Sequence, residues 1–162
     1  MKFNIFNQDN LARVGELHFS KGVIQTPVFM PVGTYGTVKA MTPDELLALG
    51  AEIVLGNTYH LMVRPGEDVI SLHKGLHNFM GWQKPILTDS GGFQIWSLSK
   101  KTKINNDFVE FDSPVNGDMI RLTPEKAMQI QDTLGSDIQM VLDECTHYPA
   151  SKKEAESSML RS

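Results

Sequence analysis

Apolar residues follow two different rhythms along this chain, and the change between them separates a leading region from the rest. The leading region has short alternating or apolar runs at residues 15–19 and 23–28, separated by Ser20-Lys21-Gly22. Such runs on either side of a polar turn with a glycine are typical of a β-hairpin. We therefore predict a leading β region over about residues 1–27, ahead of any helix.

From residue 28 onward, short and mostly apolar runs each end in a polar or glycine-containing loop. These runs lie at residues 28–32, 52–55, 85–87 and 138–142. Short apolar runs bounded by turn residues are typical of strands that are buried on both faces, as in a parallel sheet. The loops that follow them would then lie together at one edge of that sheet.

Helix-start signals lie between the apolar runs. Thr42 and Thr123 each precede a proline, which is the order of a capping residue and a first helical residue. Glu45, three residues after Thr42, completes a capping box. We expect these helices to end at the glycines at 50 and 135, another helix over about residues 64–73, and one more that begins at Ser151. The repetition of strand, loop and helix predicts a parallel α/β architecture.

One segment interrupts this repetition. Residues 108–112 and 119–122 are short strand-like runs on either side of Asn116-Gly117, and this dipeptide is the strongest short-range hairpin signal in the chain. We therefore predict an antiparallel hairpin near residues 108–122, inserted into the first βα units of residues 28–162. Residues 1–162 as a whole are expected to be one portion of a single domain.

Composition limits the classes of function. The 162 residues are 41% hydrophobic and 21% charged, which is ordinary for one globular domain or part of one. A membrane protein would have a run of about eighteen apolar residues, and a secreted protein would begin with a leader. We find neither pattern in the sequence and therefore expect a cytoplasmic protein. The net charge of −4, taken alone, disfavours a nucleic-acid partner, because backbone binding depends on clustered Lys and Arg.

The chain offers few metal ligands. Cys145 is the single cysteine, so the chain has neither an internal disulfide nor a thiolate zinc cluster of its own. His73 and His77 are spaced to share a helix face, but the residues between them lack the glutamate of a zinc-hydrolase motif. We expect both histidines to be solvated and no metal site within residues 1–162.

Candidate chemistry gathers after the third apolar run, where Asp89, Ser90, Gly91 and Gly92 follow each other. A carboxylate at the carboxyl end of a parallel strand lies where α/β folds bind their ligands. Two successive residues without Cβ atoms would let a flat or charged ligand approach the backbone closely. A plain glycine turn with a capping aspartate is the alternative interpretation of these residues.

A second aspartate, Asp143, follows the fourth apolar run in the equivalent place. If the two strands are neighbours, they lie roughly 5 Å apart and both carboxylates reach one crevice. A site with one base and one recognition carboxylate is then physically reasonable, because two close acids have different pKa values. The alternative is that Asp143 caps a following helix and faces solvent. Cys145 fits a pocket-wall thiol better than a nucleophile, because no partner His-Asn pair is identifiable.

Several motifs resemble those of the bacterial queuine tRNA-ribosyltransferases, the tRNA-guanine transglycosylases. They span almost the whole chain in the same order: TPVFMPVGT (26–34), LGNTYHL (55–61), FMGW (79–82), LTDSGGFQ (87–94), LGSD (134–137) and DECTHYP (143–149). The resemblance implies a glycosyltransferase with a TIM-barrel fold. Such an enzyme exchanges the wobble guanine of certain tRNAs for a 7-deazaguanine such as prequeuosine, in queuosine biosynthesis. The exchange is a double displacement through a covalent ribosyl-enzyme intermediate.

The resemblance also implies roles for individual residues. Asp89 would be the general acid/base, acting as proton acceptor, and Asp143 would recognise the base. The remaining pocket residues implied by the family are Ser90, Gly91, Gly92, Phe93, Asn57, Gln94 and Cys145. An aromatic ring at Phe93 suits stacking on an extruded base, and an ionised carboxylate suits the N1–H and amine donors of guanine.

This chain also departs from the family. The family's aspartate nucleophile, a Gln-containing pocket segment and a zinc site of three cysteines and one histidine lie beyond the equivalent of residue 162. A complete barrel needs about 250 residues. The sequence is therefore expected to be the N-terminal part of a TIM (β/α)8 barrel with a leading β-hairpin region and an inserted hairpin, inactive alone. The resemblance implies that the full-length enzyme binds zinc, tRNA and a guanine or 7-deazaguanine base, and that it is a homodimer.

Two other interpretations stay open. A non-catalytic purine- or tRNA-binding module is compatible with the missing nucleophile, although the acidic net charge disfavours it. The second interpretation is another TIM-barrel enzyme with a two-carboxylate site. A test of whether 7-deazaguanines bind at all would discriminate such an enzyme from a transglycosylase.

Overall fold

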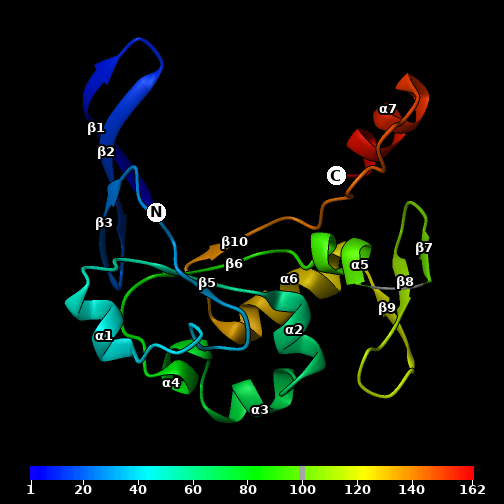
Figure 1. The fold of residues 1–162 in the computed structure, drawn as a ribbon, viewed down its shortest axis with the longest axis horizontal. Helices are drawn as coiled ribbons and strands as arrows, with labels where there is room; N and C mark the ends of the chain where they lie inside the picture. Colours follow the sequence, from blue (N-terminus) through cyan, green and yellow to red (C-terminus); the bar gives the residue numbers. More distant parts are fainter. Residues whose placement is uncertain (99–100) are drawn as a thin grey trace.

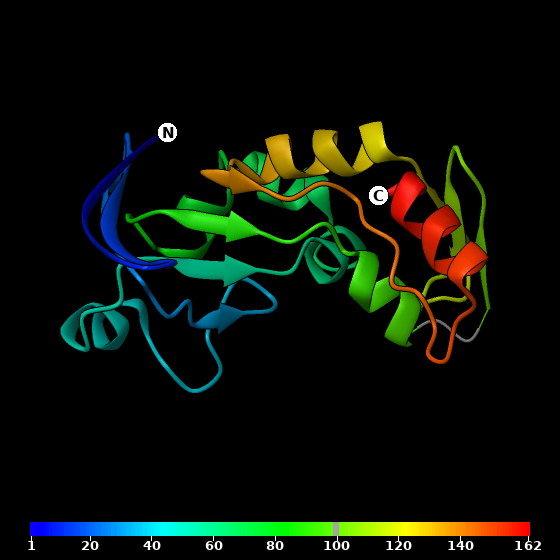
Figure 2. The same ribbon diagram turned by 90° about the horizontal axis from the view of Figure 1, so that it is seen from above.

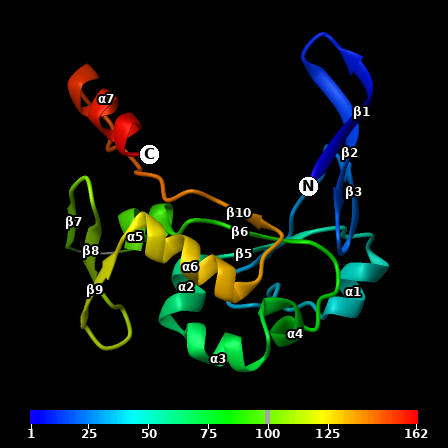
Figure 3. The same ribbon diagram turned by 180° about the vertical axis from the view of Figure 1, so that it is seen from behind.

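The computed structural model describes residues 1–98 and 101–162, which form a mixed α/β fold with three β-sheets (Figure 1). An antiparallel sheet built from the first residues extends away from a central body. The body consists of a parallel sheet and the helices packed around it. A second antiparallel sheet and the C-terminal helix lie at the opposite end of the molecule (Figures 1 and 3).

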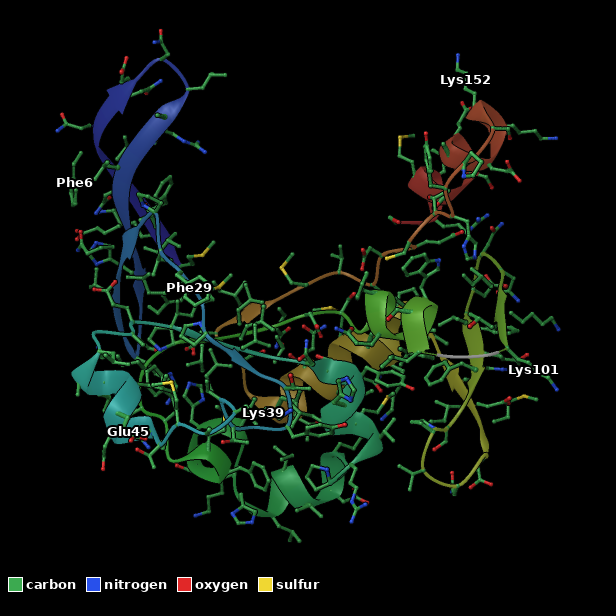
Figure 4. The ribbon with its side chains drawn as sticks, in the orientation of Figure 1. Phe6, Phe29, Lys39, Glu45, Lys101 and Lys152 are labelled. Carbon is green, nitrogen blue, oxygen red and sulfur yellow. The ribbon has the colours of Figure 1, made fainter. Side chains whose placement is uncertain are left out.

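The first sheet contains β1 (Lys2–Asp9), β2 (Ala12–Phe19) and β3 (Gly22–Thr26) in that order. The predicted hairpin is present as β2 and β3, which pair antiparallel. β1 is an additional strand on the outer edge of β2. Its apolar residues stay open to solvent, with Phe6 56% exposed and on the outer side of the ribbon (Figure 4).

The second sheet is parallel and has the strand order β10-β6-β5-β4. Its strands are β4 (Val32–Gly33), β5 (Val54–Gly56), β6 (Ile86–Thr88) and β10 (Ile138–Gln139). All four predicted runs supply a strand, but the two edge strands are shorter than predicted. At the β10 edge, Met140 donates one more backbone hydrogen bond to Thr88, at 3.2 Å, and Val141 is then 64% exposed. An edge strand has a partner on one side alone, so its pairing ends where that partner turns away.

The predicted helix starts at 42, 123 and 151 are confirmed. α1 (Pro43–Ala48) and α7 (Lys152–Arg161) both begin with complete capping boxes, on Thr42 and Ser151. α6 (Pro124–Leu134) begins after Thr123, whose side chain accepts from Lys126 N, and ends at Gly135 in the left-handed conformation. Figure 2 shows α6 running alongside the β10 edge of the parallel strands.

Four short helices follow the central strands along the chain, three of them between β5 and β6 and one after β6. They are α2 (Thr58–Val63), α3 (Glu67–Leu72), α4 (Leu76–Met80) and α5 (Gly92–Leu98). Of these, α3 alone matches a predicted helix. α2 occupies residues that were expected to form a loop. Its N-cap residue, Asn57, makes no side-chain capping bond.

The third sheet has the order β7-β8-β9. The predicted hairpin is present as β8 (Val109–Asp112) and β9 (Met119–Leu122), and β7 (Thr102–Ile104) adds a strand that was not predicted. The turn is wider than two residues, because Ser113 N donates to Asp118 O at 2.8 Å and Gly117 N to Ser113 O at 2.9 Å. Lys101 beside β7 and Lys152 in α7 lie at the same end of the molecule (Figure 4).

The core lies between the parallel sheet and the helices. Fully or nearly fully buried residues include Tyr59, Trp82, Ile86, Ile130 and Leu134. The prediction for His77 is wrong: this side chain is buried, and its Nε2 lies 3.0 Å from Asp137 Oδ2. It belongs to α4, separated from the exposed His73 by a break at Gly75, where φ is 105°. No helix in the described part of the chain is long and apolar enough to cross a membrane.

Candidate active site

The candidate site lies where β5, β6 and β10 end. Gly56 pairs with Thr88, and Gln139 pairs with Thr88 from the other side. Asn57 and Asp89 are the residues that come directly after the first pair, so they leave the sheet side by side. β6 is the neighbour of β10, which confirms the adjacency that was predicted for the strands leading to Asp89 and Asp143.

Asp89 is held by donors from three directions. Its Oδ1 accepts a hydrogen bond from Thr58 N at 2.8 Å, and its Oδ2 accepts from Asn57 Nδ2 at 2.5 Å and from Gln94 Nε2 at 3.0 Å. The backbone is fixed as well, because Thr58 Oγ1 donates to Asp89 O at 2.6 Å. Both oxygens of this carboxylate therefore act as hydrogen-bond acceptors, and its neighbours fix its position.

Asp143 is exposed and is approached from the Asp89 loop. Ser90 Oγ donates to Asp143 Oδ1 at 2.7 Å, and Gly92 N donates to Ser90 Oγ at 3.1 Å. This relay connects the two loops directly. Of the alternative interpretation, the helix-capping part is wrong, because the next helix is α7 and Ser151 caps it, whereas the expected exposure of Asp143 to solvent is confirmed.

Gly91 and Gly92 are required for different structural reasons. Gly91 has φ of +86°, a left-handed conformation that side chains rarely adopt. A Cβ on Gly92 would lie 2.3 Å from Asp143 O and 2.8 Å from its Oδ1. Only glycine therefore lets the start of α5 approach the Asp143 loop this closely. The next side chain, Phe93, is 56% exposed, and its ring centroid lies 5.6 Å from that of Trp96.

Cys145 is half-buried beside this site. Burial raises the pKa of its thiol, and the negative charges of Asp143 and Glu144 raise it further. The thiol is therefore neutral near pH 7, as fits a residue of a pocket wall and not a thiolate nucleophile. A cavity beneath the loop is lined by Cys145 together with apolar side chains of α5 and β8, among them Ile95 and Val109.

Two residues close to Asp89 were not predicted. Thr58 contributes its backbone N–H, which any residue type supplies, so no sequence signal identifies it. His60 packs edge-on against Tyr35, with ring centroids 4.8 Å apart. Burial lowers the pKa of His60, and the negative charge of Asp89 opposes that shift.

Within residues 1–98 and 101–162, no group of three or more His, Cys, Asp or Glu side chains is placed to hold a metal ion.

The chain is similar to known proteins over nearly its whole length. The chain is 61% identical to a queuine tRNA-ribosyltransferase of Thiobacillus denitrificans over 159 residues, which cover 98% of this chain and 43% of that protein. It is 61% identical over 159 residues to the protein of the same name from Pseudoalteromonas translucida, covering 98% of this chain and 42% of the relative. A Shewanella baltica relative with that name is 59% identical, with the same coverage of 98% and 42%.

The chain thus spans less than half the length of the curated relatives it matches. Residues 8–162 match the family model described as queuine tRNA-ribosyltransferase. Because this match covers nearly the whole sequence, the chain belongs to the queuine tRNA-ribosyltransferase family.

Proposed function

We propose that residues 1–162 are the N-terminal part of a tRNA-guanine transglycosylase. The full-length enzyme would exchange the wobble guanine of tRNA for a 7-deazaguanine base such as prequeuosine. The observation that carries this proposal is the pair of aspartates on the loops after neighbouring strands, with Ser90, the residue next to Asp89, bonded to Asp143. The similar proteins are named queuine tRNA-ribosyltransferases, and this name supports the same chemistry.

Asp89 is proposed as the proton acceptor. In a double displacement, a carboxylate from the remaining part of the enzyme forms a bond to ribose C1′, and the bond from C1′ to guanine N9 breaks with its electron pair going to the base. The released guanine anion takes up a proton. The incoming base then attacks C1′ through N9, and its N9 proton passes to Asp89 while the bond between C1′ and the enzyme's carboxylate breaks, so one proton is taken up and one given up in each exchange. An ionised carboxylate fixed by three donors suits that proton transfer, because its position and charge are set before the substrate arrives.

Asp143 is proposed as the group that reads the base. Ser90 occupies one oxygen of its carboxylate, which leaves other lone pairs for the N1–H and exocyclic amine of guanine. Adenine lacks this donor pair, so its binding would leave the carboxylate without a partner, and it would be rejected. Phe93 would stack on the base, and Gly92, Gln94, Asn57 and Cys145 would border the pocket.

The parallel sheet is proposed as the first part of a TIM (β/α)8 barrel. Its four strands follow the order of the chain from β4 to β5, β6 and β10, as successive strands of such a barrel do. The first sheet and the β7-β8-β9 insertion would be additions to this single domain. In the full-length enzyme we propose a zinc site outside residues 1–162, a homodimeric state and a cytoplasmic location, following the family resemblance.

A base-exchange assay tests this function. The full-length protein should incorporate radiolabelled guanine into unmodified tRNA, and unlabelled prequeuosine base should compete with the label. If calorimetry shows guanine binding but the tRNA gains no label, a purine-binding module without turnover would replace this proposal. Failure to bind guanine and 7-deazaguanines at all would favour another two-carboxylate enzyme.

A further inference from the structure

We propose that Arg161 is a positioning residue for base recognition, because it and Glu144 clamp the loop that carries Asp143. This inference rests on the proposed role of Asp143 as the reader of a guanine-type base. We define the clamp as the contacts between Glu144 or Thr146 and the last turns of α7, residues 157–162. The substrate class that it affects is the purine or 7-deazapurine base, and not the tRNA chain.

The Asp143 loop needs support from outside the sheet. β10 ends at Gln139, and residues 140–150 have no helix or strand. The last backbone bond of this segment to β6 is the one from Met140 N to Thr88 O. Two residues, Val141 and Leu142, separate Met140 from Asp143, so the parallel sheet itself does not fix the carboxylate.

Arg161 forms a bidentate ion pair with Glu144. Its Nε donates to Glu144 Oε2, and its Nη2 donates to Oε1 at 2.9 Å. Both side chains are largely covered, with 26% of Arg161 and 16% of Glu144 exposed. The hydrogen bonds from Arg161 lower the pKa of Glu144, and Arg161 Nη1 is itself oriented by Ser157 Oγ at 2.7 Å. A forked pair of this kind fixes direction as well as distance.

The backbone of Glu144 is also held by α7. Its N–H donates to Ser162 Oγ at 2.9 Å, and its carbonyl accepts from Ser158 Oγ at 3.3 Å. Ser158 is 2% exposed, and its Oγ also lies 2.6 Å from Thr146 Oγ1. Side chain, N–H and carbonyl of one residue are thus bound to one face of one helix.

The clamp fixes the position of Asp143 because of the residues on either side of it. Glu144 is joined to Asp143 by one peptide bond, so fixing its backbone limits the directions that the carboxylate takes. On the other side, Gly92 approaches Asp143 so closely that no Cβ fits between them. Asp143 is therefore confined between α5 and the loop residues that α7 holds. Catalytic and binding groups depend on such supports, because displacements near 1 Å change rates by roughly a hundredfold.

The test compares Arg161→Met with Arg121→Met in the full-length protein. Arg121 is a matched control, because its Nε and Nη2 also bind one glutamate, Glu110, at 2.9 and 2.6 Å, but within the β8-β9 hairpin. Arg161→Met should raise the KM for guanine and weaken guanine binding in calorimetry, each by roughly tenfold or more. Its KM for tRNA should stay within about twofold of that of Arg121→Met.

Two further variants separate positioning from loss of fold. Arg161→Lys keeps the charge without the fork and should have a guanine KM between wild type and Arg161→Met. Glu144→Gln combined with Arg161→Met should be no worse than Arg161→Met alone, since both changes break one interaction. Melting temperatures measured for every variant identify any that unfolds, and Arg161→Lys then decides the question.

The possible failures are distinguishable. A wild-type protein that exchanges guanine normally, with Arg161→Met and Arg161→Lys showing unchanged guanine KM and affinity, would overturn the clamp alone. Equal losses for tRNA and base in Arg161→Met would also overturn it, because they indicate general disruption. A wild-type protein that neither binds nor exchanges guanine would overturn the proposed function, and the clamp's role in base recognition with it.

Discussion

Replacing Asp89 with asparagine changes the charge at the centre of the candidate site with almost no change of volume. In the native site both oxygens accept, with Thr58 N–H on Oδ1 and two side-chain amides on Oδ2. The introduced amide retains one oxygen, which the Thr58 N–H would keep, and its new NH2 group would face the NH2 groups of Asn57 and Gln94. Donors would then oppose donors until the neighbouring amides turn over.

The structure limits the cost of this rearrangement. Gln94 Oε1 is buried and has no hydrogen-bond partner among the described residues, so turning the Gln94 amide would give the introduced NH2 group an acceptor. The lost contribution is the charge assistance of these bonds, worth about 1 to 3 kcal/mol in total stability. A domain of this size has a stability of about 5–15 kcal/mol, so the variant should stay folded.

The effect on chemistry should be much larger than the effect on folding. Asparagine takes up no proton near neutral pH, and a general base contributes about 10²- to 10⁴-fold to a rate. We expect Asp89→Asn in the full-length enzyme to lose base exchange by at least this factor, measured as labelled guanine entering tRNA. The melting temperature, followed by circular dichroism, should fall by a few degrees only.

Asp112→Asn provides the control, because Asp112 is an exposed aspartate at the end of β8, away from the crevice. This variant should keep the full rate. Full activity of Asp89→Asn would remove Asp89 from the mechanism, and an unfolded Asp89→Asn protein would show that the three donors tolerate no neutral acceptor.

Four other outcomes follow from the same contacts. Asp143→Ala should weaken guanine binding by about 2 to 4 kcal/mol, roughly 30- to 700-fold in calorimetry, and unchanged affinity would leave Asp143 without a role in recognition. Gly92→Ala should weaken guanine binding as well, because the new Cβ would lie 2.3 Å from Asp143 O and would push the Asp143 backbone away. An unchanged KM for guanine would contradict this. Burial lowers the pKa of His77 in the folded state, so the unfolded chain binds the extra proton more readily and stability should fall as the pH drops below about 6.5. Denaturant unfolding at several pH values should show a shallower fall for His77→Asn than for His73→Asn, which alters an exposed ring, and equal slopes would refute it. Residues 1–162 alone should incorporate no labelled guanine and should self-associate in sedimentation experiments, because the β10 edge and apolar side chains such as Phe29, 82% exposed, stay open; label entering tRNA at the full-length rate would place the nucleophile within these residues.

The features that were predictable from sequence are those set by neighbours a few residues apart. Thr42 and Glu45 satisfy each other's backbone groups across one turn, so the helix start is visible in the spacing alone. The runs before Asn57 and Asp89 indicated strands because apolar residues stop abruptly at a polar loop. Both strand ends, and hence the place of the candidate site, follow from such local chemistry.

The features that were missed depend on partners far away in the sequence. α2 begins at Thr58 because its first N–H and its hydroxyl bind Asp89, 31 residues further on. His77 is buried by its contact with Asp137, 60 residues away, although its spacing from His73 suggested a shared, solvated face. Such contacts cannot be identified from the sequence, because Thr, Asp and His also occur at exposed positions without such partners.

The different supports of the two aspartates suit different tasks. Asp89 is bonded to residues next to β5 and to α5, so its position is fixed by the parallel sheet and by the first turn of a helix. Proton transfer requires this rigidity, because its rate depends on hydrogen-bond geometry with the reacting nitrogen. Asp143 is exposed, is bonded to Ser90 and is carried by a loop that α7 holds at the next residue. A base reader must accept both guanine and a 7-deazaguanine with a substituent, so a carboxylate on a supported loop suits this task better than one built into the sheet. The prediction for Asp89 therefore concerns kcat, whereas the predictions for Asp143, Gly92 and Arg161 concern the KM for the base.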